Sequence, residues 1–271
     1  MMAAFLFYIQ GMDNQEIKTI QFTSLVGSAL VKHGVVLRTG GYSKGMYQSL
    51  NLSSKCGDDI TAVNRNRKLL AEWLGIESDK VLFPDQCHTA NVSIVANHEL
   101  PSLTETDAII TNQHKLAIGV LAADCVPVLF YDAVNGVIAA AHAGWKGTVQ
   151  KIVPKVIELM AEKFNSKPEE IWVGIGPAIG AQRYEVGIEV HNAVAHCNPE
   201  AMAFCYQPSI KPGHGTLDLQ ALNRHQALAS GIRKTQIETI GLCTYDNPHL
   251  FFSARRDGFS CGRFASVIML I

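Results

Sequence analysis

Apolar and polar positions along the chain follow a helical period in some segments. Apolar residues spaced three and four positions apart predict a helix from 59 to 74, which Gly75 ends. Three further helices are predicted over 147–164, 187–196 and 218–230. Pro154 lies inside the first of these, so it should kink that helix or belong to its first turn.

Other segments are short apolar runs that lack helical spacing. They are rich in Val, Ile and Ala, which favours strands. The predicted strands are 80–83, 91–95, 107–110, 116–122, 126–131, 136–141, 170–175, 237–242, 249–253 and 265–270. Strands that come in clusters, rather than in strict alternation with helices, indicate an α+β fold with mixed sheets.

The chain shows no repeat, low-complexity tract or linker. We therefore expect an N-terminal extension and first strand region at 1–32, followed by a single catalytic domain at 33–271. Met12 is a plausible start beside Met1. The N-terminus lacks the positive region and cleavage site of a signal peptide, and no apolar run is long enough to span a bilayer.

Composition and charge exclude several classes of protein. The chain is 48% apolar and 17% charged, as is usual for a soluble enzyme. Its net charge of −1 does not indicate binding to nucleic acid or to an anionic membrane. Its seven cysteines are odd in number and irregular in spacing, and none forms a CxxC pair. A disulfide framework is therefore not expected, and a reducing, cytoplasmic location fits better.

The main candidate for chemistry is a cysteine with two histidines. Cys125 lies where one apolar run meets the next, His142 ends the run that follows, and His88 comes after a short run upstream. One thiolate and two imidazoles suffice for a zinc site that keeps its fourth position open. We therefore predict zinc at these three residues, although their spacing matches no zinc finger. Asp124 is expected to orient a ligand or to take part in proton transfer.

A second candidate is a set of arginines beside glycine-rich backbone: Arg38, Arg255, Arg256 and Arg263. A guanidinium fork binds phosphate or carboxylate oxygens in pairs. Solvated turns with surface salt bridges are an equally good interpretation of this pattern. A third glycine-rich segment, Gly174–Gly180, is not a dinucleotide fingerprint, and the chain has neither a P-loop nor a GxSxG elbow.

Several segments together closely resemble the YfiH-type laccase-domain family. They cover nearly the whole chain from about residue 33, and the pair ADCxP and HAGWxG is quite specific. The matching segments include Arg38–Ser43, Ser49–Leu52, Asn66–Arg67, Gln86–His88, Ala123–Pro127, Ala141–Gly147, Gly176–Gly180, Tyr184–Val186 and Ser253–Arg256.

The resemblance implies a fold, an activity and a cofactor. The fold would be a four-layer αββα arrangement around mixed sheets. The activity would be zinc-dependent phosphorolysis of adenosine, inosine, guanosine or methylthioadenosine to base and ribose 1-phosphate, with adenosine deamination in the same site. The family's zinc ligands match His88, Cys125 and His142. Expected partners are small molecules only, in a monomer or a homodimer.

The same activity assigns roles to the polar residues. Arg38 and Arg256 are the expected phosphate ligands, with Arg255 and Arg263 behind them. Asn51 and Gln86 are expected to hold sugar or base. The predicted catalytic residues are Cys125, His142 and Asp124.

Three alternatives remain at this stage. A His₂Cys set also suits copper, as in a polyphenol oxidase, but a multicopper enzyme needs more clustered histidines than this chain offers. A metal-free cysteine hydrolase could use Cys125 with His142 on amide bonds, as in the editing of peptidoglycan precursors. A non-enzymatic binding protein agrees least with an open metal site.

Overall fold

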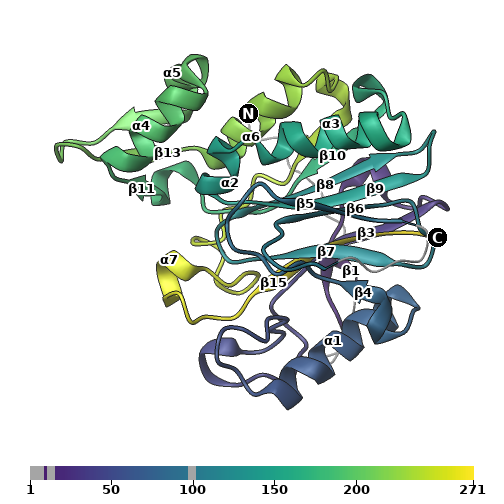
Figure 1. The fold of residues 1–271 in the computed structure, drawn as a ribbon. Helices are drawn as coiled ribbons and strands as arrows, with labels where there is room; N and C mark the ends of the chain where they lie inside the picture. The colour runs from purple at the N-terminus through teal and green to yellow at the C-terminus, as the bar shows by residue number, and fades with distance from the viewer. Residues whose placement is uncertain (1–8, 11–15, 97–101) are drawn as a thin grey trace.

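Two six-stranded sheets stack face to face between two layers of helices in the computed structural model (Figure 1). The structure describes residues 9–10, 16–96 and 102–271. The two candidate start residues, Met1 and Met12, lie outside this described part. The arrangement confirms the predicted α+β class and the αββα layers with mixed sheets.

The first sheet has the order β1-β2-β3-β15-β7-β4. Its strands are β1 (Ile9–Gln10), β2 (Thr19–Ile20), β3 (Val31–Val36), β4 (Val81–Leu82), β7 (Ala117–Ala122) and β15 (Phe264–Leu270). β3 runs across the predicted boundary at residues 32 and 33 and pairs with β15, so segments from both ends of the chain form the centre of this sheet.

The second sheet has the order β14-β10-β8-β9-β6-β5. Its strands are β5 (Val92–Val95), β6 (Ala108–Thr111), β8 (Val126–Asp132), β9 (Val137–Ala143), β10 (Trp172–Ile175) and β14 (Ile237–Thr239). β8 and β9 form an antiparallel pair, whereas β5 pairs with β6 and β10 with β14 in parallel.

Strand periodicity explains why both sheets are buried on two faces. Along β9, Ile138 and Ala140 point into the core between the sheets, while Ala139 and Ala141 point to the helical layer. Successive side chains of a strand face opposite sides, so an unbroken apolar run fits a strand covered on both faces.

Helices cover the two outer faces. α1 (Ile60–Leu74) packs Leu70 and Leu74 against the first sheet, and α3 (Ile152–Phe164) and α6 (Leu219–Ala229) cover the second. The predicted ends of α1 are confirmed: the Asp59 side chain caps its first turn, and Gly75 adopts a left-handed conformation with φ 78°. No helix in the described residues is long and apolar enough to cross a membrane.

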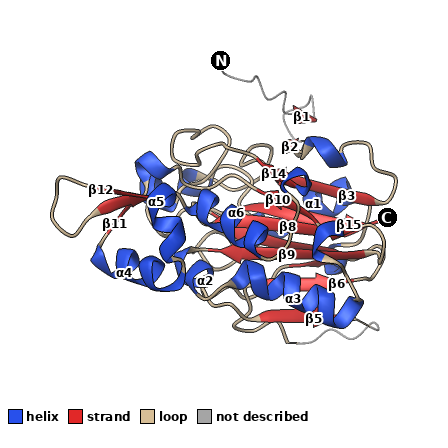
Figure 2. Ribbon diagram, turned by 90° about the horizontal axis from the view of Figure 1, so that it is seen from above, coloured by secondary structure: helices blue, strands red, loops and turns tan. Residues whose placement is uncertain are grey.

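A small third sheet extends the molecule at one end, where α4 and α5 lie beside it (Figures 1 and 2). Its strands and helices are β11 (Glu185–Val186), β12 (Tyr206–Pro208), β13 (Gly215–Leu217), α4 (Ile188–Cys197) and α5 (Met202–Cys205). The apolar pattern predicts α4 but not this sheet, because strands of two or three residues are too short to show a period.

Two other predictions were wrong in part. The helix expected over 147–164 is two helices, α2 (Trp145–Val149) and α3, because Lys151 between them is left-handed with φ 63°. Pro154 therefore lies in the first turn of α3 and not at a kink, which was one of the two outcomes predicted for it. The strand expected at 249–253 is a turn and coil, although Phe251 and Phe252 are fully buried.

Candidate metal centre

Two histidines and a cysteine meet where β8 begins and β9 ends. We call His88, Cys125 and His142 the His/Cys/His cluster; their donor atoms all lie within 4.8 Å of one another. Cys125 Sγ is 3.8 Å from His88 Nε2, and the two imidazole centroids are 5.0 Å apart. Pairing of Val126 with Ala143 places Cys125 beside the end of β9. The structure thus brings together the three residues that the sequence predicts as ligands.

A glycine leaves space for the cluster. A Cβ atom added at Gly144 would lie 3.0 Å from Cys125 Sγ and 3.0 Å from His88 Cδ2. Both distances are too short for ordinary van der Waals contact, so any side chain here would push the two groups apart. This explains why a small-residue turn follows His142 in the sequence.

The turn that carries Cys125 is held by its neighbour Asp124. Asp124 has a φ of 93°, a strained value for a residue with a side chain. Its carboxylate accepts hydrogen bonds from Thr244 Oγ1 at 2.6 Å and from the Arg255 amide at 2.7 Å. Its carbonyl oxygen accepts from the Ile179 amide at 2.9 Å. Both carboxylate oxygens therefore have donors, and the contacts fix the backbone that presents the thiol.

A buried carboxylate that the sequence analysis missed organises the two histidines. Asp107 Oδ1 lies 2.8 Å from His142 Nδ1 and accepts from the His88 amide at 3.0 Å. Asp107 Oδ2 accepts from the Thr89 amide at 2.7 Å and from its hydroxyl at 2.8 Å. With Nδ1 directed to Asp107, His142 keeps Nε2 for a ligand. The only signal in the sequence is a lone carboxylate directly before the apolar strand β6.

The electrostatics of the cluster favour a thiolate. Burial alone would raise the pKa of the Cys125 thiol, but the charge and hydrogen bonding of His142 and His88 outweigh it and lower that pKa. Burial likewise opposes the charged form of His142, whereas the Cys125 thiolate and Asp107 raise the pKa of His142. Thiolate is the form of cysteine that binds metals and attacks electrophiles, so the cluster is prepared for either role.

The cluster opens into a cavity of about 850 Å³. This volume suits a small-molecule site. Of the residues predicted for the site, the lining includes His88, Cys125, His142, Asp124, Gln86, Arg255 and Arg263. Arg38, Asn51 and Arg256 are outside the lining.

Two of the predicted polar residues have their side chains engaged with the protein itself. Gln86 donates to the Leu121 carbonyl at 2.7 Å and accepts from the Leu121 amide at 2.8 Å. Fully buried Asn51 accepts from the amides of Ser53 and Arg263, at 3.0 and 2.9 Å. The first pair fastens the loop before His88 to β7, and the second joins the segments that carry Asn51 and Arg263.

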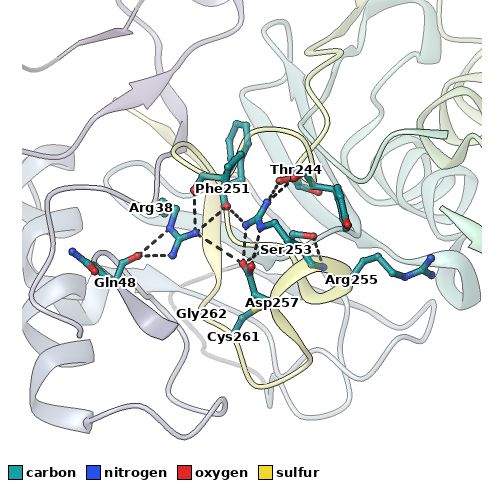
Figure 3. A network of polar contacts seen from close by, with 12 residues as sticks. Arg38, Gln48, Thr244, Phe251, Ser253, Arg255, Asp257, Cys261 and Gly262 are labelled. Carbon is teal, nitrogen blue, oxygen red and sulfur yellow. Dashed lines mark hydrogen bonds and ion pairs between the residues drawn. The ribbon is translucent and has the colours of Figure 1, made fainter. Parts of the chain in front are cut away.

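Arg38 and Arg256 form a separate network with Asp257, which we call the arginine cluster (Figure 3). Arg256 Nη1 donates to the carbonyls of Thr244 and Tyr245 at 2.7 and 2.8 Å, and its Nη2 to the Phe251 carbonyl at 2.9 Å. The remaining donors of Arg256 bind Asp257 at 2.7 and 2.8 Å.

Arg38 is used in the same way. It donates through Nε and Nη2 to the Gln48 carbonyl at 3.0 and 2.8 Å, and through Nη1 to the Pro248 carbonyl at 3.0 Å. The arginine cluster therefore satisfies carbonyl groups of turns from both ends of the chain. Such groups must find donors when water is excluded.

One arginine differs from these. Arg67, on α1, lines the cavity and donates through Nε to the Leu52 carbonyl at 3.0 Å. Within the described part of the chain, its Nη1 and Nη2 make no hydrogen bond. Burial lowers the pKa of Arg67, and no carboxylate opposes that shift. The sequence analysis noted Arg67 only as part of a family motif, because unused donors cannot be recognised without the fold.

Comparisons with known proteins agree with the motifs. The profile of the family described as multi-copper polyphenol oxidoreductase laccase matches residues 32–271. A Bacteroides thetaiotaomicron protein named purine nucleoside phosphorylase is 34% identical over 261 residues, covering 93% of this chain and 96% of its own. Adenosine deaminase RL5, from an unknown prokaryotic organism, is 34% identical over 227 residues, covering 80% and 85%.

A solved structure agrees as well. The crystal structure of YlmD from Geobacillus stearothermophilus has a TM-score of 0.89 and 30% identity to this chain, covering 97% of it and 99% of YlmD. The profile match extends over most of the sequence, and the relatives cover most of both chains. On this evidence, the chain belongs to the multi-copper polyphenol oxidoreductase laccase family, as its motifs predict.

Proposed function

We propose that the protein is a zinc-dependent purine nucleoside phosphorylase that also deaminates adenosine in the same cavity. One observation carries the proposal: the His/Cys/His cluster opens into the same cavity as the guanidinium of Arg67, whose Nη1 and Nη2 make no hydrogen bond among the described residues. The cluster suits a metal ion, and the guanidinium suits phosphate. Relatives named purine nucleoside phosphorylase and adenosine deaminase support the choice.

The donor set favours zinc. Zinc binds imidazole nitrogen and thiolate sulfur at about 2.0–2.3 Å, and catalytic sites use three protein ligands with one open position. Donor atoms within 4.8 Å of one another are close enough to share one ion. When bound, zinc would supply a Lewis acid at the cavity wall. Copper fits less well, because among the described residues only this cluster is arranged to hold a metal.

The geometry favours Arg67 over Arg38 and Arg256 as the phosphate ligand. Phosphate is an anion whose oxygens match a guanidinium fork, and a binding arginine needs donors that the protein has not used. Arg67 has two such nitrogens facing no acceptor in the described residues. Arg263 and Lys55 also line this cavity, where Lys55 forms an ion pair with Asp85.

Phosphorolysis exchanges one bond at the sugar for another. A phosphate oxygen bonds to C1′ of ribose, the bond from C1′ to the base breaks, and the electron pair leaves with the purine, which takes up a proton. Arg67 would hold the phosphate for this attack. Asp124 would keep the thiolate-bearing turn in place, and Arg255 would line the nucleoside site. Deamination replaces the amino group at C6 by oxygen from water, releases ammonia and needs no phosphate.

A nucleoside panel tests this function. Zinc-loaded protein is incubated with adenosine, inosine, guanosine and methylthioadenosine, with and without phosphate, and the products are identified by mass. We expect free base and the sugar 1-phosphate only with phosphate, and inosine from adenosine in either buffer. Cys125→Ala should lower bound zinc from about one per chain to near none and abolish both reactions. No product from any nucleoside would refute the proposal.

The phosphate site has its own test. Arg67→Ala should raise the phosphate KM about tenfold to a hundredfold, because a charge-assisted bidentate contact is lost. Arg65→Ala is the matched control, since Arg65 lies on the same helix but stacks on Tyr42 at 3.6 Å and is outside the cavity lining. Equal phosphate saturation in the two variants would remove Arg67 from the site.

A specific observation favours a second candidate, a cysteine hydrolase. Cys125, His142 and Asp107 have the order of nucleophile, base and orienting carboxylate, with 2.8 Å between the last two. Such an enzyme would cleave amide bonds without metal. A chelated protein that turns over amide substrates, and loses this activity when Cys125 is alkylated, would support it. Activity that appears only with added zinc would oppose it.

A further inference from the structure

One exposed aromatic side chain lies on the wall of the cavity. Phe259 is 88% exposed, which is unusual for a large apolar ring. Other large apolar side chains in the described residues are also exposed, among them Phe204 and Ile210, but Phe259 alone among them lines the cavity. The exposed ring therefore lies at the proposed substrate site.

The turn that carries Phe259 is firmly anchored. The Cys261 amide donates to the Gly258 carbonyl at 3.1 Å, and Arg263 Nη2 donates to the Phe259 carbonyl at 2.8 Å. Cys261 is fully buried, and a Cβ atom at Gly262 would lie 2.6 Å from the Phe252 ring. The base of the turn is thus packed into the core while its tip projects, so the ring is held in place without being covered.

The other aromatic rings of the cavity already have a partner. Arg67 lies over Phe83, Lys146 over Trp145 and Arg255 over Tyr184, with the cation 5.3–5.8 Å from each ring centroid. Phe259 has no ring or cation partner among the described residues. It is therefore the aromatic ring of the lining that is exposed and has no stacking partner in the described residues.

We propose that Phe259 stacks on the purine base of the nucleoside and determines how tightly the base is held. This inference rests on the proposed function. A flat base gains favourable contact on an aromatic face, and that contact does not depend on which purine is present. Phe259 is thus a binding residue for the base, which it holds without distinguishing one purine from another.

The test compares three variants of the zinc-loaded protein. Phe259→Ala should raise the KM for inosine and guanosine by a similar factor, about fivefold to a hundredfold, with kcat and the phosphate KM little changed. Phe259→Trp should restore the wild-type KM, because it restores a stacking face. Phe204→Ala is the matched control, since Phe204 is an exposed aromatic outside the cavity lining, and its kinetics should not change.

The outcomes separate this inference from the function on which it rests. If the wild-type protein makes ribose 1-phosphate but Phe259→Ala keeps the wild-type nucleoside KM, the stacking role is wrong and the function stands. If Phe259→Ala lowers kcat and changes the phosphate KM equally, the residue acts on the fold of the site and not on the base. If the wild-type protein makes no product, both fall. Equilibrium dialysis of inosine without phosphate gives a second readout, and Phe259→Ala should weaken binding by the same factor as the KM.

Discussion

The His/Cys/His cluster and the arginine cluster look alike in the sequence and differ in the structure. Both are polar groups beside glycine turns, and both are brought together from distant segments. In the first, three donor atoms converge on a cavity. In the second, Arg38 and Arg256 direct their nitrogens to backbone carbonyls and to Asp257 (Figure 3). The difference shows that a functional side chain is one whose donor atoms are not already bonded to the protein itself.

The largest expected effect is a loss of stability when the arginine cluster is disrupted. Arg256→Ala removes a charged partner from Asp257 and the donor of the Thr244 and Tyr245 carbonyls. We expect the free energy of unfolding to fall by about 3–5 kcal/mol, because several charge-assisted hydrogen bonds of this partly buried arginine are lost together. Urea denaturation measures this.

Metal content distinguishes this effect from a functional one. Folded Arg256→Ala protein should bind zinc as the wild type does, because the residue contacts no member of the His/Cys/His cluster. Wild-type stability together with a raised phosphate KM would instead place Arg256 in the phosphate site and contradict the comparison.

The first sheet contains another buried histidine, whose pKa is lowered, whereas that of His142 is raised. His33, on β3, accepts a hydrogen bond from the Phe22 amide at 3.0 Å, and burial lowers its pKa to about 4. The unfolded chain, with a histidine pKa near 6.5, therefore takes up the proton first as the pH falls. His33 should thus cost stability between about pH 6.5 and pH 4, by about 3 kcal/mol in total.

Denaturation of the wild type and of His33→Gln from pH 7.5 to pH 4 isolates this effect. Glutamine can accept the same hydrogen bond but does not titrate in this range. The wild type should lose more stability than the variant as the pH falls. Parallel curves would mean that the pKa of His33 is the same in the folded and the unfolded protein.

A smaller effect is expected from the carboxylate behind the His/Cys/His cluster. Asp107→Asn should weaken zinc binding about tenfold to a hundredfold, because an orienting carboxylate fixes the histidine tautomer. The matched control is Asp132→Asn, another fully buried carboxylate, which accepts from Val134 and Asn135 in a turn. Competition with a chelator measures both affinities. Equal zinc affinity in the two variants would show that Asp107 does not tune the metal.

The sequence predicted the parts of the fold that have a long, clear period. α1 with its Asp59 and Gly75 ends, and the long strands β7, β8, β9 and β15, follow from apolar spacing and caps. The third sheet did not, because its strands are short and depend on tertiary pairing. Nor did the break at Lys151, since a left-handed residue between two helices has no signal in apolar spacing.

The candidate site divides in the same way. The pattern of residue types, with their places at the ends of apolar runs and in the family motifs, was enough to select His88, Cys125 and His142. It was not enough to rank the arginines or to find Asp107, because those roles depend on hydrogen-bond partners that only the fold supplies. Side chains that act through their neighbours are therefore the hardest to predict from sequence.

We expect the His/Cys/His cluster to bind a metal and the arginine cluster to stabilise the fold. Anomalous diffraction at the zinc absorption edge, from crystals of zinc-loaded protein, tests it most directly. We predict one peak at the cluster, about 2.0–2.1 Å from a nitrogen of His88 and of His142 and about 2.3 Å from Cys125 Sγ. Crystals of active protein with no peak there, or with zinc bound only elsewhere, would contradict the account.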